Sequence, residues 1–123
     1  MILYIAFGGL LGTVARYLLQ GWVQERAGGS FPLGTLAVNL AGSLALGFVL
    51  RYATGSNLVS PEVRAGAAIG FCGAFTTMST FGYETTTLLA AGDYRRAALY
   101  VAGSLLGCLA AVFAGAALAN KLL

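Results

Sequence analysis

The sequence predicts an all-α integral membrane protein with four transmembrane helices, the third of them broken in mid-membrane. Composition is the first reason: 59% of the 123 residues are apolar and 9% are charged, and the mean hydropathy is +0.83. Soluble domains carry about a quarter charged residues, so a soluble fold could not cover its surface with this sequence. Length is the second reason, because a spanning helix needs about 20 apolar residues and four of them use up the chain. We therefore expect a single four-helix transmembrane domain over residues 1–123.

Four apolar stretches are the predicted helices. They run from about Ile2 to Trp22, Leu33 to Tyr52, Val63 to Ala90 and Ala97 to Leu118. Gly28, Gly29 and Pro32 interrupt the chain between the first two. Before the third, Ser60 is a suitable N-cap, Pro61 suits the first helical position and Glu62 places an acid in the first turn. The 18 glycines predict close helix packing, because lipid supplies no hydrophobic drive between helices.

The third stretch has an unusual middle. Between residues 70 and 82 it contains three glycines (Gly70, Gly73, Gly82) and four hydroxyl residues (Thr76, Thr77, Ser79, Thr80). We expect the glycines to break the helix there, and a break inside lipid is tolerated only where protein or a cavity surrounds the freed backbone. The threonines at 85–87 fit a simpler interpretation, in which each hydroxyl bonds to a carbonyl of its own helix.

Basic residues are almost equally divided between the two sides of the membrane. One side holds three, Arg51, Arg64 and Lys121, and the other holds Arg26, Arg95 and Arg96, with Arg16 inside the first helix toward that side. The positive-inside rule needs an excess to set orientation. The count therefore allows insertion in both orientations and antiparallel pairing of two copies, and it equally allows one weakly biased orientation. The net charge of +3 comes without any Lys/Arg run, so nucleic acid is not an expected partner.

Three polar residues within apolar stretches are candidate functional residues. Arg16 either extends its side chain to the nearer interface or has a packing or vestibule role. Asn39, in the middle of the second helix, either makes an interhelical hydrogen bond or donates toward an anion path. Glu84 is the only acid deep in an apolar stretch. It lies past the predicted break, so we expect a vestibule position, with a solvated surface group as the alternative.

Tyr100, Ser104 and Cys108 are spaced four residues apart and so share one face of the fourth helix. This face is either an ordinary helix contact or a polar track along a pore. The chain has no histidine, which excludes His-based metal sites and proton relays. An interior with neutral donors and few titratable groups suits a small anion that must bind weakly enough to leave.

Three segments together resemble the Fluc (CrcB) family of fluoride channels. They are GGLLGTVARY (8–17), GTLAVNLAGSLALG (34–47) and GFCGAFTTMSTFGYE (70–84), and the likeness covers nearly the whole chain. The resemblance implies a channel for passive fluoride export in a prokaryotic inner membrane. It also implies a dual-topology antiparallel homodimer with two pores, which agrees with the balanced charge count.

The resemblance also implies roles for individual residues. A sodium ion at the centre of the dimer would be held by backbone carbonyls of the broken helix, which correspond to Gly73 and Thr76. Phe81 matches the second pore phenylalanine, whose ring edge faces fluoride. The other matches are the pore asparagine (Asn39), two pore hydroxyls (Ser79, Thr80), the polar track (Tyr100, Ser104 and Cys108, where serine is more usual), the acid near the pore mouth (Glu84) and the arginine of the first helix (Arg16).

Met78 is the clear departure from the family pattern, because it stands where the first pore phenylalanine usually lies. Methionine has no aromatic edge, so one station of each pore would lack its ring. We expect conduction to survive, since a flexible apolar side chain still excludes water and leaves the neighbouring hydroxyls in place.

Two other functions compete with a channel. A proton-coupled small multidrug exporter needs a titratable acid in its binding site, and Glu84 is the one candidate. A small structural subunit of a larger membrane complex would also use glycine-rich helices. An enzyme is not expected, because no Ser/His or metal-ligand constellation is present.

Overall fold

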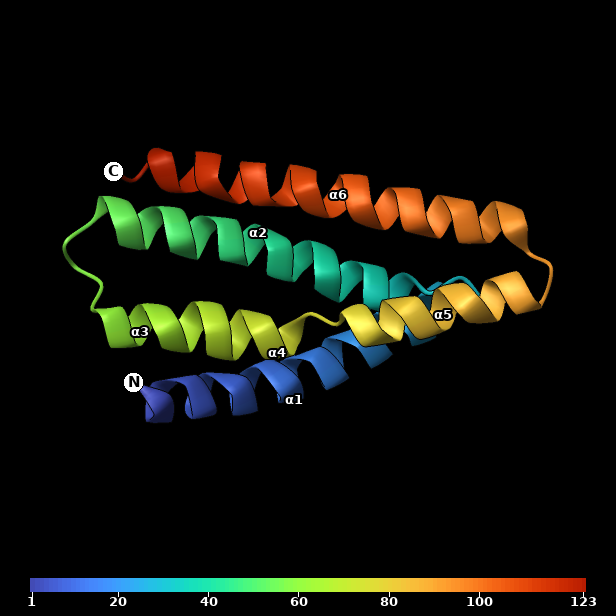
Figure 1. The fold of residues 1–123 in the computed structure, drawn as a ribbon, viewed down its shortest axis with the longest axis horizontal. Helices are drawn as coiled ribbons and strands as arrows, with labels where there is room; N and C mark the ends of the chain where they lie inside the picture. Colours follow the sequence, from blue (N-terminus) through green and yellow to red (C-terminus); the bar gives the residue numbers. More distant parts are fainter.

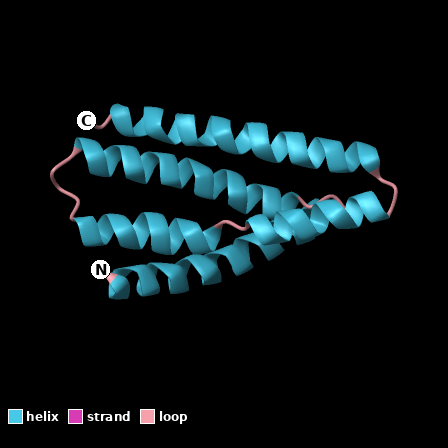
Figure 2. Ribbon diagram, in the orientation of Figure 1, coloured by secondary structure: helices cyan, strands magenta, loops and turns pink.

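The computed structural model describes all residues 1–123 and is entirely helical, as Figures 1 and 2 show. Its elements, in chain order, are α1 (Ile2–Ala27), α2 (Leu33–Gly55), α3 (Pro61–Ala65), the π-helix η1 (Gly66–Cys72), α4 (Gly73–Phe75), α5 (Met78–Ala90) and α6 (Tyr94–Asn120). Helices α1, α2 and α6 are each long and apolar enough to cross a membrane. The fourth span consists of α3, η1 and α4 followed, after a break, by α5. The prediction of four helices with the third broken is confirmed.

The long helices extend a few residues beyond their predicted ends. α1 continues through Arg26, which lies over the Trp22 ring at 4.7 Å, and ends where Gly28 adopts a φ of 63°. α6 begins at Tyr94 because the side chain of Asp93 accepts a hydrogen bond from the Arg96 N–H at 3.4 Å. In both places a glycine or a capping side chain sets the end, and the apolar residues alone did not reveal it.

The two termini lie at one end of the bundle, together with the connection between α2 and α3 (Figure 1). The connections α1–α2 and α5–α6 lie at the opposite end. This arrangement follows from four spans joined by short connections, and it places the basic residues at the two ends as the sequence predicted. The Ser60 cap is also confirmed, since its hydroxyl accepts a hydrogen bond from Val63 N–H at 3.3 Å.

Glycines let the helices approach one another closely. α2 packs along α6, and α1 packs along η1 and α4. A Cβ atom placed on Gly47 would overlap the carbonyl oxygen of Val112, and one placed on Gly115 would overlap that of Leu44. The expected role of glycine in helix packing is thus confirmed between α2 and α6.

Candidate functional site

The break in the third span lies at two threonines. α4 ends at Phe75, Thr76 and Thr77 have extended backbones with ψ angles of 159° and 112°, and α5 starts at Met78. The prediction that glycines break the helix is wrong. Gly70 lies within a continuous helical stretch, where its missing side chain leaves room for the backbone of Ile5 on α1. Thr77 starts the new helix instead, because its hydroxyl accepts from Thr80 N–H at 3.3 Å.

Asn39 on α2 holds the break in place. Its Nδ2 donates to the Thr77 carbonyl at 3.2 Å, and Thr77 N–H donates to Asn39 Oδ1 at 2.8 Å. Both polar backbone groups of Thr77 are therefore satisfied by one side chain. The second N–H of this amide has no hydrogen-bond acceptor in the structure, and the side chain also lines a cavity beside the break. The predicted interhelical hydrogen bond of Asn39 is thus present, and one N–H of its amide remains without an acceptor.

Arg16 on α1 reaches the other side of the break. Its Nε donates to the carbonyl oxygen of Ala74 at 3.0 Å, and the side chain is partly buried. The guanidinium therefore contacts the C-terminal end of the first half of the broken helix (Pro61–Phe75). A cation at this position complements the partial negative charge of a helix C-terminus. The structure thus supports a packing role for this side chain.

The remaining backbone carbonyls of the break differ in whether they have partners. Those of Ala74 and Thr77 accept the side-chain hydrogen bonds of Arg16 and Asn39. Those of Gly73, Phe75 and Thr76 accept no hydrogen bond. Gly73 is exposed and has open space where a Cβ atom would lie. A set of unpaired carbonyl oxygens therefore remains at the break.

A cavity of about 350 Å³ lies beside the break, between α2, α4, α5 and α6. It brings together seven of the predicted site residues, from four helices and the break itself: Asn39, Gly73, Thr76, Met78, Phe81, Ser104 and Cys108. The Ser104 side chain is 5% exposed, and its hydroxyl has no hydrogen-bond partner in the structure. Buried hydroxyls without a partner are costly. This cavity thus contains an unsatisfied donor suited to a bound anion or water.

Met78 also lines this cavity, but its side chain is 73% exposed on the outer face of the chain. Ser79 beside it is exposed as well. Thr80 is tied into the break, because its hydroxyl accepts from Thr77 Oγ1 at 2.9 Å. Both hydroxyls thus contact Thr77, since Ser79 Oγ lies 3.4 Å from Thr77 Oγ1, but Ser79 is also exposed.

Glu84 is half-buried, and two hydroxyl groups donate hydrogen bonds to its carboxylate. Thr35 Oγ1 donates to its Oε1 at 2.6 Å, and the Tyr100 hydroxyl donates to its Oε2 at 3.2 Å. Gln20 Nε2 in turn donates to Thr35 Oγ1 at 3.0 Å. Helices α2 and α6 thus supply partners for both oxygens of this half-buried carboxylate.

Sequence reasoning missed Thr35 and Gln20. Thr35 is buried, with 1% exposure, and it precedes Asn39 by four residues, so both lie on one face of α2. That spacing was the available signal. Gln20 offered none, because a single glutamine near the end of an apolar helix is ordinary.

Tyr100 connects the two polar regions. Its ring lies 5.1 Å from the Phe81 ring, which lines the first cavity, and 5.7 Å edge-on from Phe31. Its hydroxyl reaches Glu84, which lines a second cavity of about 440 Å³ together with Gln20 and Thr35. Because Ser104 and Cys108 follow on the same helix face and line the first cavity, this face of α6 runs from one cavity to the other.

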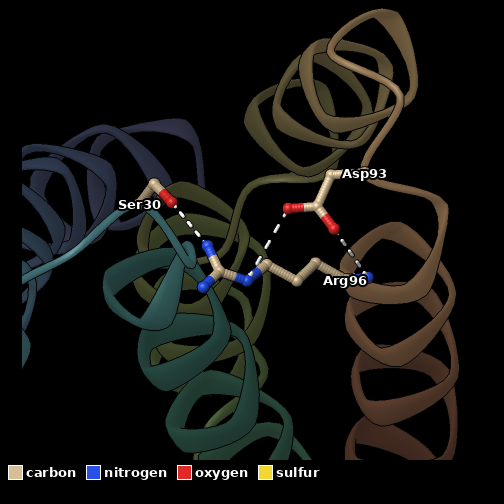
Figure 3. A network of polar contacts seen from close by, with 3 residues as sticks. All are labelled: Ser30, Asp93 and Arg96. Atoms are coloured by element: carbon tan, nitrogen blue, oxygen red, sulfur yellow. Dashed lines mark hydrogen bonds and ion pairs between the residues drawn. The ribbon is translucent and has the colours of Figure 1, made fainter.

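Ser30, Asp93 and Arg96 form a network of polar contacts (Figure 3). Ser30 and Asp93 also line the second cavity. Arg96 Nη1 donates to Ser30 Oγ at 2.7 Å, and its Nε lies 3.6 Å from Asp93 Oδ2. Figure 3 shows the arginine side chain bridging the α1–α2 connection and the turn before α6. These groups are exposed, so their contribution to stability is small, but they put one cation beside the opening.

The chain matches the family described as CrcB-like protein, Camphor Resistance (CrcB), over residues 3–116. It is 45% identical over 121 residues to a protein of Geotalea uraniireducens named fluoride-specific ion channel FluC, covering 98% of each chain. Proteins of the same name from Geobacter sulfurreducens and Chlorobaculum tepidum are each 48% identical, covering 98% and 97% of this chain and 98% and 94% of their own. With four membrane spans and this likeness over nearly its whole length, the chain belongs to the CrcB family of multi-pass membrane proteins.

Proposed function

We propose that this protein is a fluoride channel through which fluoride leaves the cell passively. The observation that carries the proposal is the buried hydroxyl of Ser104, a residue that lines the cavity beside the break: this hydroxyl has no partner in the protein. The curated relatives, which are named fluoride-specific ion channels, supply the identity of the anion. No enzymatic step is involved.

The groups around this cavity suit an anion that binds and leaves again. Ser104 offers a hydroxyl, Asn39 offers its second N–H, and Phe81 offers the positive edge of its ring. None of these three groups carries a full charge, so none would hold fluoride too tightly for conduction.

We propose Tyr100, Ser104 and Cys108 as the track along which fluoride moves between the two cavities. Glu84 and Asp93 line the second cavity, and Arg96 pairs with Asp93. Met78, Ser79 and Thr80 are proposed to line the pore from the break, with conduction surviving the absence of a ring at residue 78.

The occupant proposed for the outer face of the break is a second, antiparallel copy of this chain. Two observations support a copy rather than lipid: the Gly73 backbone faces open space, and the carbonyls of Gly73 and Thr76 have no partner. Unpaired backbone groups are costly in lipid. The near-equal division of basic residues between the two sides is compatible with insertion in both orientations.

The donor set at this face fits a sodium ion, because hard cations take oxygen ligands and Gly73 and Thr76 supply free carbonyl oxygens. The ion would supply positive charge for carbonyls that the break leaves without hydrogen bonds. We propose that both copies contribute these two carbonyls, so that the ion joins the two broken helices.

The test is fluoride efflux from liposomes that contain the purified protein, followed with a fluoride electrode and with chloride as the control ion. The proposal expects fast fluoride efflux, negligible chloride efflux and no need for a proton gradient. A flux that follows an imposed proton gradient would identify an exporter instead. Absence of flux from folded, dimeric protein would identify a structural subunit.

The antiparallel dimer has its own test. A single cysteine introduced at Asn57, in the exposed connection between α2 and α3, in a Cys72→Ala, Cys108→Ser background, can be labelled from either side of intact vesicles. Dual topology expects about half of the molecules to be labelled from each side, and labelling from one side alone would overturn it.

A further inference from the structure

Arg16 contacts the stretch of chain that supplies the proposed sodium ligands. Its Nε binds the carbonyl of Ala74, which is the residue immediately after Gly73 and two residues before Thr76. The two residues that this bond joins are 58 positions apart, so it fixes α1 against the end of α4. The Ala74 carbonyl belongs to the rigid peptide plane that joins Ala74 to Phe75, and the adjoining plane, linked to it through the Ala74 Cα, carries the Gly73 carbonyl. Holding the first plane therefore restricts the second.

The bond also distinguishes two kinds of carbonyl at the break. The Ala74 carbonyl accepts a hydrogen bond from Arg16 on α1, whereas the carbonyls of Gly73 and Thr76 accept none. Without Arg16, the Ala74 carbonyl would lack a partner inside the membrane. The end of the half-helix would then shift to satisfy that group, since buried backbone acceptors without partners are strongly disfavoured.

We propose that Arg16 is a positioning residue for the sodium site: its Nε–H bond to Ala74 holds the end of α4 so that the Gly73 and Thr76 carbonyls stay available to the ion. This inference rests on the proposed function, which supplies the sodium ion. We assign the positioning to the hydrogen bond and not to the positive charge of Arg16, because a guanidinium close to the site repels a sodium ion.

Three substitutions separate the bond from the charge. Arg16→Gln places an amide nitrogen on Cδ, the atom that carries Nε in arginine, and so keeps the donor while removing the charge. Arg16→Lys keeps the charge but carries its nitrogen one carbon farther along the side chain. Arg16→Leu removes both. Arg51→Leu is the matched control, since Arg51 is exposed and bonds Asn120 at the C-terminal end of α6.

The measurement is the thermal unfolding midpoint of purified full-length protein, titrated with sodium chloride at constant ionic strength made up with N-methyl-D-glucamine chloride. A ligand that binds the folded state stabilises it by RT ln(1 + [L]/Kd), so the unfolding midpoint begins to rise once the sodium concentration passes the Kd of the site. The sodium concentration at which this rise begins should be about ten-fold or more higher in Arg16→Leu, as for other residues that orient a metal ligand. It should rise in Arg16→Lys too, and stay near wild type in Arg16→Gln and Arg51→Leu.

Each other outcome overturns the inference. If the unfolding midpoint of Arg16→Leu depends on sodium concentration as that of wild type does, the bond does not position the site. A loss in Arg16→Gln with retention in Arg16→Lys would assign the role to the charge. If Arg16→Leu does not fold, Arg16→Gln and Arg16→Lys still distinguish a role of the hydrogen bond from a role of the charge. If wild type itself shows no sodium dependence, the sodium proposal fails and this inference with it, whereas a sodium-dependent wild type with an unchanged Arg16→Leu rejects the inference alone.

Discussion

Asn39 and Thr77 form a two-point clamp across the bundle, in which one side-chain amide satisfies both the N–H and the C=O of one backbone residue, at 2.8 Å and 3.2 Å. The clamp joins α2 to the residue that starts α5. It lets the chain leave one helix and begin another inside the membrane without exposing the polar backbone of Thr77 to lipid.

Asn39→Ala should destabilise the protein by about 2–4 kcal/mol, because it leaves two partly buried backbone groups without partners. The measurement is the free energy of unfolding in detergent, with Asn57→Ala as the control, since Asn57 is exposed in a connection and makes no side-chain hydrogen bond in the structure. Equal stability of the two variants would mean that the clamp contributes nothing to the fold.

Ser104→Ala should separate stability from conduction. The hydroxyl has no partner in the protein, so removing it should leave the unfolding midpoint unchanged or raise it. Fluoride efflux should fall by about ten-fold if the lost donor was worth roughly 1.4 kcal/mol to the ion. Thr86→Val is the control, because that hydroxyl bonds a carbonyl of its own helix. Unchanged efflux in Ser104→Ala would remove this residue from the path.

Glu84→Gln should lower the stability by about 1–3 kcal/mol, because it weakens two hydrogen bonds that a carboxylate accepts from Thr35 and Tyr100. Fluoride efflux should be reduced but measurable, and it should be the same with and without an imposed pH gradient. The gradient experiment on wild type is the control. Complete loss of transport in the variant, with a wild type driven by protons, would instead identify Glu84 as the coupling acid of an exporter.

Met78→Phe should leave fluoride efflux equal to or above wild type, because it adds an aromatic edge at a position that already lines the cavity. The Met78 side chain is 73% exposed in the single chain, so the change should have little effect on the fold of the monomer. Met78→Ala tests bulk alone and should lower efflux. If wild type conducts nothing and only Met78→Phe restores flux, the expectation that conduction survives methionine is wrong.

Two glycines of α6 should respond differently to the same substitution. Gly115→Ala places a Cβ atom against the Leu44 backbone and should destabilise the protein by about 1–3 kcal/mol. Gly103→Ala meets no atom of the chain within 4 Å, and it should be neutral or stabilising by about 0.5–1 kcal/mol in the monomer, because alanine favours the helix. A comparison of unfolding in detergent tests the pair, and equal effects would contradict close packing of α2 on α6.

Several features were predictable because they depend on neighbouring residues. Apolar stretches of sufficient length determine the membrane class and the four spans, and Ser60 and Pro61 mark the start of the third. The back-bonding of Thr85 and Thr87 to carbonyls four residues earlier was also predicted and is present. Candidate polar residues were found for a similar reason, since Asn39 and Glu84 stand out in apolar surroundings.

The tertiary structure decided where the third span opens and what holds it open. The deciding bonds join Asn39 to Thr77 and Arg16 to Ala74, which are 38 and 58 residues apart. No local pattern contains such a pair, so composition suggested the glycines although the extended residues are threonines. The partners of Glu84 depended on the fold in the same way, because Thr35 lies 49 residues before it on another helix. Composition thus determined that the protein is a bundle in lipid, and long-range packing determined which polar groups are satisfied and which, as at Ser104, are left free for a ligand.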